Sequence, residues 1–313
     1  MPTVLVCDPI AENGIEILRS AAEVDVKIGL TEDQLVEIVA NYDALMVRSQ
    51  TKITRRVLEA ATKLQIVGRA GVGVDNIDVP AATEQGVIVV NSPAGNTVAV
   101  AELALGMMLS LVRKLIPAHQ SIAQGEWKRS KFLGTELYGK TLGIVGVGRI
   151  GVEVARRATA FGMTILGYDP FLTSQRAGQL GIEATSIEDI LRRADFVTLH
   201  TPLTKDTRHL INANSLATMK PGAVILNCAR GGIIDETALY EALKAGTLGG
   251  AGLDVYEVEP PKENPLRELD NVILTPHLGA STEEAQVEAP RCGVRMTLSS
   301  SRSGFSLGGS TSY

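Results

Sequence analysis

The segment 146–151, Gly-Val-Gly-Arg-Ile-Gly, constrains the possible folds more than any other part of this chain. It joins an apolar run, 141–145, to a stretch with apolar residues at helical spacing, 150–161. A second apolar run, 163–168, ends at Asp169. Strand, glycine turn, helix, strand and acid in this order are the dinucleotide-binding fingerprint. We therefore predict a nucleotide site at this turn.

Each glycine of the fingerprint has its own role. Gly146 permits the tight turn, Gly148 lets a pyrophosphate approach the backbone, and Gly151 allows the helix to pack closely on the strand. The start of the helix then offers free N–H groups to the phosphates. Asp169 follows Gly151 by eighteen residues, close to the expected spacing of about 20. Its carboxylate can accept a hydrogen bond from a ribose 2′-OH and would repel a 2′-phosphate, which favours NAD over NADP.

Length and composition describe an ordinary globular chain. Its 313 residues suggest two domains, since a domain holds about 150 residues. The net charge of −5 predicts no basic face for nucleic acid or for an anionic membrane. Three scattered cysteines argue against a disulfide framework or a zinc site, and no secretory signal is expected, so we expect a cytoplasmic protein. The most apolar segment, 98–112, contains Glu102 and is shorter than the roughly 18 residues of a membrane span, which predicts a buried helix.

The alternation of short apolar runs with helical stretches predicts two domains of one type. Residues 1–95 read as a complete α/β domain, in which Thr31 and Thr54 are placed to cap helices. A turn-rich junction precedes residues 96–282, which repeat the same alternation. Strands alternating with helices imply a parallel sheet covered on both faces. We therefore predict an α/β fold with two doubly wound parallel sheets.

Residues 283–313 depart from this pattern. Pro290 would disrupt a helix interior, at a cost of about 3 kcal/mol. Residues 298–313 are dominated by serine and glycine and show little apolar periodicity. We expect the remnant of a helix followed by disordered chain.

Arg230, Glu259 and His277 stand out among the polar residues that follow predicted strands. In open parallel sheets the ligand crevice lies at the carboxyl ends of the strands. Hydride transfer to a 2-oxo acid needs a cation that orients the carboxylate and polarises the carbonyl, and a proton donor that titrates near neutral pH. Arginine and histidine suit these two tasks, and a neighbouring carboxylate would favour protonated histidine. By position alone, a solvated loop side chain remains the alternative for each of the three.

The motifs around these residues resemble the D-isomer-specific 2-hydroxyacid dehydrogenase family. The resemblance covers residues 1 to about 288 and implies a flavodoxin-like substrate domain and a Rossmann NAD-binding domain. It assigns Arg230 to the substrate carboxylate and carbonyl, His277 to acid/base chemistry and Glu259 to pairing with the histidine. The segments that carry it, in family order, are 146–151, 200–203, 227–232, 253–260 and 276–280.

The resemblance also implies the residues around each ligand. Segments 68–76, 127–137 and 277–282 resemble the family members that oxidise 3-phospho-D-glycerate with NAD in serine biosynthesis. The implied substrate shell, whose cations suit a phosphate, comprises Arg48, Arg69, Gly73, Asn96 and Arg129. The implied cofactor shell comprises Val72, Gly146, Gly148, Arg149, Ile150, Gly151, Asp169, Thr201, Pro202, Thr207, Cys228, Ala229, Asp254, His277 and Gly279.

The partner implied by the resemblance is a second copy of the chain, in a homodimer formed through the NAD-binding domain. Relatives continue into a helix that returns to the first domain, and longer forms add modules that bind serine. The different segment from Ala289 onward predicts that serine feedback is absent. Three alternatives remain open: a glyoxylate or hydroxypyruvate reductase, an NAD-sensing interaction protein similar to the related corepressors, and a damaged chain that folds poorly.

Overall fold

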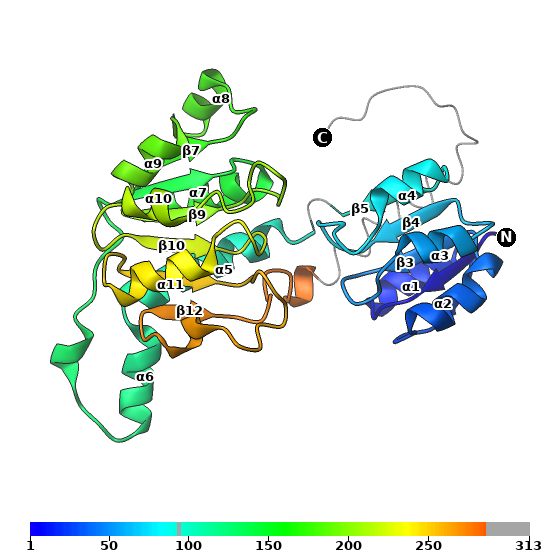
Figure 1. Ribbon diagram of the computed structural model, residues 1–313, viewed down its shortest axis with the longest axis horizontal. Coiled ribbons are helices and arrows are strands. Elements are labelled where there is room, and N and C mark those ends of the chain that lie inside the picture. The colour runs from blue at the N-terminus through cyan, green and yellow to red at the C-terminus, as the bar shows by residue number, and fades with distance from the viewer. Residues whose placement is uncertain (93–94, 286–313) are drawn as a thin grey trace. The chain divides into compact units, whose positions relative to one another are not determined.

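The computed structural model describes residues 1–92 and 95–285, which form two compact units (Figure 1). The first unit holds Met1–Asn96 together with the described residues from Ala280 onward, and the second holds Thr97–Gly279. The second unit therefore ends three residues before the boundary expected at 282. The tail that the sequence predicts to be disordered lies outside the described residues.

The first unit is a five-stranded parallel sheet with the strand order β2-β1-β3-β4-β5. This order is flavodoxin-like, as expected. Its strands are β1 (Thr3–Val6), β2 (Glu23–Val26), β3 (Ala44–Val47), β4 (Ile66–Arg69) and β5 (Ile88–Asn91). Its helices are α1 (Glu12–Arg19), α2 (Glu32–Ile38), the 3₁₀-helix η1 (Val39–Asn41), α3 (Arg55–Ala60) and α4 (Val79–Glu84).

Local signals and packing explain these elements. The Thr31 hydroxyl accepts a hydrogen bond from the backbone N–H of Gln34 at 3.3 Å, within a capping box, and the Thr54 hydroxyl accepts one from Val57 at 3.4 Å. Both predicted caps are therefore confirmed. Alternate strand residues face opposite sides of the sheet, where α2, α3 and α4 cover one apolar cluster and α1 covers the other.

The second unit is a seven-stranded parallel sheet with the order β12-β11-β10-β9-β6-β7-β8. Its strands are β6 (Thr141–Val145), β7 (Thr164–Tyr168), β8 (Glu183–Ala184), β9 (Phe196–Leu199), β10 (Val224–Asn227), β11 (Gly250–Leu253) and β12 (Val272–Leu274). Its helices are α5 (Thr97–Val112), α6 (Leu115–Ala123), α7 (Arg149–Ala160), α8 (Ser174–Gln179), α9 (Ile187–Arg193), α10 (Ala213–Ala217) and α11 (Glu236–Lys244), with 3₁₀-helices η2 (Arg129–Phe132) and η3 (Pro265–Glu268).

Helices cover both faces of this second sheet, which confirms the predicted doubly wound fold. Residues of α5, α7 and α8 pack into one apolar cluster, and residues of α9, α10 and α11 pack into the other. The apolar segment 98–112 lies within α5, whose Ala101, Ala104 and Met108 are fully buried. Within residues 1–92 and 95–285, no helix is both long and apolar enough to cross a bilayer.

Each sheet has a topological switch point, where the chain reverses the direction in which strands are added. In the second unit this point lies beside β6, which has β7 on one side and β9 on the other. In the first unit it lies between β1 and β3. Ligands of open α/β sheets bind outside the carboxyl ends of strands at such points. The loops that follow these strands are therefore the first places to search for a site.

Candidate active site

The glycine turn between β6 and α7 leaves space that fits a dinucleotide. Gly146 has a φ of +97°, and a Cβ at this position would lie 2.6 Å from the carbonyl group of His200. A Cβ at Gly151 would lie 2.2 Å from the oxygen of Gly146. In contrast, a Cβ at Gly148 would meet nothing within 4 Å. Packing therefore requires two of the glycines, whereas the third leaves the turn open.

Polar groups near this turn lack partners within the protein. Helix α7 begins after Gly148 without a side-chain cap, so its first N–H groups can serve an anion. The Nδ1 atom of His200 and the hydroxyl of Thr201 are buried without a hydrogen-bond partner. Buried polar atoms usually have partners, so these mark a place for a polar ligand. Burial lowers the pKa of His200 to about 4, which keeps its ring neutral. These groups fit NAD.

Asp169, at the end of β7, lies beside the glycine turn. Its Oδ2 atom accepts a hydrogen bond from the backbone N–H of Val147 at 3.1 Å, and its Oδ1 atom accepts one from Phe171 at 2.9 Å. The two bonds hold the carboxylate next to the turn. A ribose attached to a pyrophosphate on the turn would meet this carboxylate.

Arg230, Glu259 and His277 come from the carboxyl ends of three neighbouring strands. Because β10, β11 and β12 are adjacent and parallel, the loops that follow them lie at one edge of the sheet. The Nδ1 atom of His277 lies 2.8 Å from the Oε2 atom of Glu259, and the other carboxylate oxygen accepts a hydrogen bond from the backbone of Tyr256 at 3.1 Å. The structure thus brings the predicted histidine and its predicted carboxylate partner together.

The two members of this pair shift each other's pKa in opposite directions. The hydrogen bond with Glu259 raises the pKa of His277; burial opposes this, and the negative charges of Glu259 and Asp254 add to it. Burial raises the pKa of Glu259, but the hydrogen bond and the charge of His277 outweigh it and hold this pKa below its usual value. Arg230 is close enough for its charge to oppose protonation at both groups to a smaller extent.

The buried carboxylate of Asp254 holds the loop that carries His277. Its Oδ1 atom accepts hydrogen bonds from the backbone of Leu278 at 2.6 Å and from the hydroxyl of Thr275 at 2.5 Å. Its Oδ2 atom accepts one from the backbone of Gly279 at 2.8 Å. His277 itself has a φ of +54°, a left-handed conformation that is uncommon for histidine. Asp254 therefore acts here as an anchor for the loop that carries His277.

The loop that carries Arg230 is held by an amide and by a close contact. The side chain of Asn227 donates to the carbonyl oxygen of Arg230 at 2.8 Å and accepts from the backbone of Ala229 at 3.1 Å. A Cβ at Gly231 would lie only 1.7 Å from the carbonyl oxygen of Tyr256. Glycine at this position thus lets the Arg230 loop contact the loop that leads to Glu259.

The other expected cofactor residues of the second unit lie on the loops at the same edge of the sheet. The hydroxyl of Thr207 donates to the carbonyl oxygen of Pro202 at 2.7 Å, which closes the turn after β9. Cys228 packs with its sulfur 3.8 Å from that of Met107, and burial raises its pKa to about 12, which disfavours a thiolate nucleophile. Arg149 and Ile150 begin helix α7.

The expected substrate residues of the first unit gather at the carboxyl edge of its sheet. Arg48 follows β3, and Arg69 ends β4. The Nε atom of Arg69 donates to the carbonyl oxygen of Arg48 at 3.3 Å. Gly73 lies in the loop after β4, next to Val72, which is expected to contact the cofactor instead, and Asn96 has a buried Oδ1 atom without a partner. Two of the expected cations are therefore neighbours.

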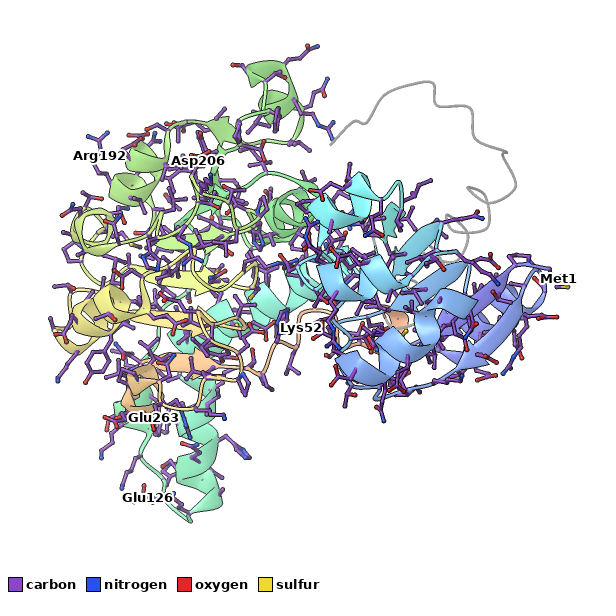
Figure 2. All side chains as sticks on the ribbon, turned by 45° about the vertical axis from the view of Figure 1, so that its right-hand side comes forward. Met1, Lys52, Glu126, Arg192, Asp206 and Glu263 are labelled. Atoms are coloured by element: carbon purple, nitrogen blue, oxygen red, sulfur yellow. The ribbon has the colours of Figure 1, made fainter. Side chains whose placement is uncertain are left out.

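Arg129 belongs to the second unit and lies in η2, far in sequence from the loops that carry Arg230, Glu259 and His277. It lines a cavity of about 550 Å³ together with Arg113, Phe132, Leu133 and Glu136. Figure 1 shows that α6 and the chain after it extend away from the body of the seven-stranded sheet, and Figure 2 labels Glu126 at the far end of this arm. We call residues 115–140 the arm, and Arg129 lies within it.

The anchoring roles of Asp254 and Asn227 are absent from the sequence-based expectations, which treat Asp254 only as a cofactor contact. Asp254, a buried acid directly after an apolar run, offered a signal for a structural role. Asn227, a polar residue that likewise comes directly after an apolar run, 223–226, offered the same signal. Within the described ranges, no three His, Cys, Asp or Glu side chains are grouped so that they could hold a metal ion.

Comparison with known proteins gives a family match and close relatives. Residues 105–279 match the family model for the NAD binding domain of D-isomer specific 2-hydroxyacid dehydrogenases. Over 290 residues the chain is 56% identical to D-3-phosphoglycerate dehydrogenase of Methanocaldococcus jannaschii, which covers 92% of this chain and 55% of that protein. The chain thus spans about half the length of the curated relatives it matches.

Two solved structures extend the similarity over nearly the whole chain. A glyoxylate reductase from Paecilomyes thermophila has a TM-score of 0.89 and 34% identity, covering 97% of this chain and 96% of that one. An NAD⁺-bound 3-phosphoglycerate dehydrogenase of Entamoeba histolytica has a TM-score of 0.81 and 30% identity. This match covers 97% of this chain and 96% of that one.

Proposed function

The chain belongs to the D-isomer-specific 2-hydroxyacid dehydrogenase family and carries its NAD-binding domain, and on this basis we propose that it interconverts 3-phospho-D-glycerate and 3-phosphohydroxypyruvate with NAD. The observation that carries the proposal is the 2.8 Å pair of His277 and Glu259, within electrostatic reach of Arg230. The identity of 56% to a D-3-phosphoglycerate dehydrogenase supports the choice of substrate. The reaction would serve serine biosynthesis.

The three side chains divide the proposed chemistry between them. Arg230 binds the substrate carboxylate and polarises the bond between C2 and its oxygen. Because Nδ1 of His277 bonds to Glu259, its Nε2 atom remains to take the hydroxyl proton during oxidation and to return it during reduction. Bound NAD supplies the nicotinamide that accepts or donates the hydride at C2. Glu259 stabilises the imidazolium that forms and fixes the orientation of the ring.

The cofactor residues named above have proposed tasks that follow from their positions. The open side of the turn at Gly148 and the uncapped start of α7 would receive the pyrophosphate. Asp169 would accept hydrogen bonds from the adenosine ribose and repel a 2′-phosphate. The unpartnered polar atoms of His200 and Thr201 would gain partners in the bound cofactor.

The pH dependence of oxidation is expected to move when Glu259 is replaced by glutamine. Oxidation needs neutral His277, so its rate rises as pH increases through the pKa of this group, which Glu259 raises. Without the carboxylate the pKa falls, and the rising limb of the kcat profile moves to lower pH. Reduction needs protonated His277, so its rate falls as pH increases through the same pKa. This fall also moves to lower pH in the variant. An unchanged profile would contradict the assignment of the pair.

Glu257→Gln is the matched control for this experiment. Glu257 lies two residues before Glu259 and pairs with a different histidine, since its Oε1 atom is 3.1 Å from Nε2 of His209. Its replacement should leave both pH limbs in place.

A glyoxylate or hydroxypyruvate reductase is the second candidate, favoured by the TM-score of 0.89 to a glyoxylate reductase. Arg48 and Arg69 distinguish the two. Replacing either arginine by glutamine is expected to lower kcat/KM for 3-phospho-D-glycerate by about 10- to 100-fold, as loss of a charge-assisted hydrogen bond to phosphate would. The value for D-glycerate should change much less. Equal losses for both substrates, measured by initial rates, would contradict a phosphate pocket at these residues.

Turnover also separates an enzyme from an NAD-sensing interaction protein, because a sensor can keep the catalytic residues without using them.

We propose a homodimer formed through the NAD-binding unit. Large apolar side chains are exposed in its arm, including Trp127, Leu133 and Tyr138, and such a group indicates an interface. A solution mass equal to one chain, measured by light scattering, would contradict the dimer.

A further inference from the structure

Asp8 occupies the switch point of the first sheet. It follows β1 by two residues, and its carboxylate is fully buried against the loop 48–51, which follows β3. In related architectures this crevice receives a ligand, often an anionic one. Here a side chain of the protein itself provides a carboxylate at that place. Figure 2 labels Lys52, which comes directly after the loop.

Four uncharged donors of the loop bind this carboxylate. The Oδ2 atom accepts hydrogen bonds from the backbone N–H groups of Arg48 at 2.6 Å and Gln50 at 3.3 Å. The Oδ1 atom accepts from the backbone N–H of Thr51 at 3.1 Å and from its hydroxyl at 2.6 Å. Converging backbone N–H groups of this kind form an anion-binding nest. The nest is therefore occupied by the protein's own carboxylate.

The carbonyl groups of the same loop are held from another direction. The side-chain amide of Asn76 donates to the carbonyl oxygens of Arg48 at 2.9 Å and Thr51 at 2.7 Å. Arg69 adds the bond from its Nε atom to Arg48 described above. Both backbone polar groups of Arg48 are thus fixed, which limits where its guanidinium group can reach.

We propose that Asp8 is a positioning residue, an internal anion that fills the backbone nest and thereby holds Arg48 in place for the substrate. This inference rests on the proposed function, in which Arg48 binds the phosphorylated acid. Since Asp8 already uses the N–H groups of Arg48, Gln50 and Thr51, those groups cannot serve the substrate. Recognition of the substrate anion in this unit therefore falls to other groups, among them the guanidinium groups of Arg48 and Arg69.

Asp8→Asn tests the proposal with little change in volume. One carboxylate oxygen becomes an NH₂ group that faces backbone N–H donors, so the loop must move. The expected result is a rise in KM for 3-phospho-D-glycerate of at least about tenfold, with kcat changed far less and with NAD affinity unchanged. Asn76→Ser, which releases the carbonyl side of the loop and leaves the buried charge alone, should raise KM in the same direction. An unchanged KM in both variants would overturn the proposal.

Asp43→Asn is the matched control. Asp43 precedes β3, at the opposite end of that strand, and its Oδ2 atom accepts hydrogen bonds from the backbone and hydroxyl of Thr3, each at 2.8 Å. It is likewise an aspartate that holds another segment of the same unit. Its replacement should lower thermal stability without raising KM. A rise in KM equal to that of Asp8→Asn would show general loosening of the unit and overturn the specific role of Asp8.

Hydrogen exchange provides a readout that needs no substrate. In Asp8→Ala the amides of Arg48 and Thr51 should exchange faster than in the unchanged protein, and added formate should slow them again by replacing the missing carboxylate. Formate should have no such effect on the unchanged protein or on Asp43→Ala. Amides that exchange at the original rate in Asp8→Ala would overturn the proposal. If the unchanged protein fails to turn over 3-phospho-D-glycerate, only the proposed function fails.

Discussion

Replacing His277 by asparagine is expected to lower kcat for oxidation of 3-phospho-D-glycerate by about 10²- to 10⁴-fold, the usual contribution of a general acid or base. Asparagine cannot take the hydroxyl proton, but it tolerates the left-handed backbone that His277 adopts at a φ of +54°. The loop anchored by Asp254 should therefore survive the replacement. NAD affinity, measured by calorimetry, should fall far less than kcat, so that most of the loss lies in chemistry.

His209→Asn is a matched control for this variant. His209 also has a positive φ, +48°, and also pairs with a glutamate, Glu257, at 3.1 Å. Its replacement removes the same chemical group from the same kind of backbone while leaving Arg230, Glu259 and His277 intact. Its kcat should remain within a few-fold of the original value. Similar losses in both histidine variants would contradict the role assigned to His277.

Replacing Arg230 by alanine is expected to lower kcat/KM by about 10²- to 10³-fold, as removal of a group that stabilises developing charge does in other enzymes. The guanidinium group is needed both to bind the carboxylate and to polarise the carbonyl. Arg230→Lys keeps the charge but lacks the planar fork, so its kcat/KM should lie between that of Arg230→Ala and that of the unchanged protein. A loss for Arg230→Ala of less than about tenfold, or 1.4 kcal/mol in barrier height, would contradict the assignment.

Arg208→Ala controls for the loss of a positive charge near the same loop. One of its Nη atoms lies 3.7 Å from the position that a Cβ on Gly232 would occupy, so it is a neighbour of the Arg230 loop. Its replacement should leave kcat/KM nearly unchanged.

The electrostatic role of Arg230 can also be checked through His277. Since the charge of Arg230 lowers the pKa of His277, Arg230→Ala should move the residual pH profile to higher pH.

The fold could be predicted from the sequence because the patterns that indicate its helices and turns lie within short stretches of the chain. Within the glycine turn between β6 and α7, Gly151 packs against the backbone of Gly146, five residues earlier in the chain. The capping threonines likewise bond only three residues along the chain. Such signals need no knowledge of strand order, and periodicity supplies the rest of the alternation.

The supports of the site could not be predicted in the same way, since they depend on strand order. Asp254 bonds to residues more than twenty positions later in the chain, and it reaches them only because β11 and β12 are neighbours. The contact between Gly231 and Tyr256 depends on the adjacency of β10 and β11. Asp8 bonds to a loop forty residues away for the same reason. Residue types indicated candidates for the chemistry, whereas the tertiary fold determines what holds them.

Direct transfer of hydrogen from C2 of the substrate tests the central claim most directly. The purified protein would be incubated with NAD and 3-phospho-D-glycerate that carries deuterium at C2, and the nicotinamide product would be examined by mass spectrometry. The account predicts reduced cofactor that has gained the deuterium, and much less of it with the His277→Asn and Arg230→Ala variants. Protein that binds NAD but transfers no deuterium from this substrate would contradict the account.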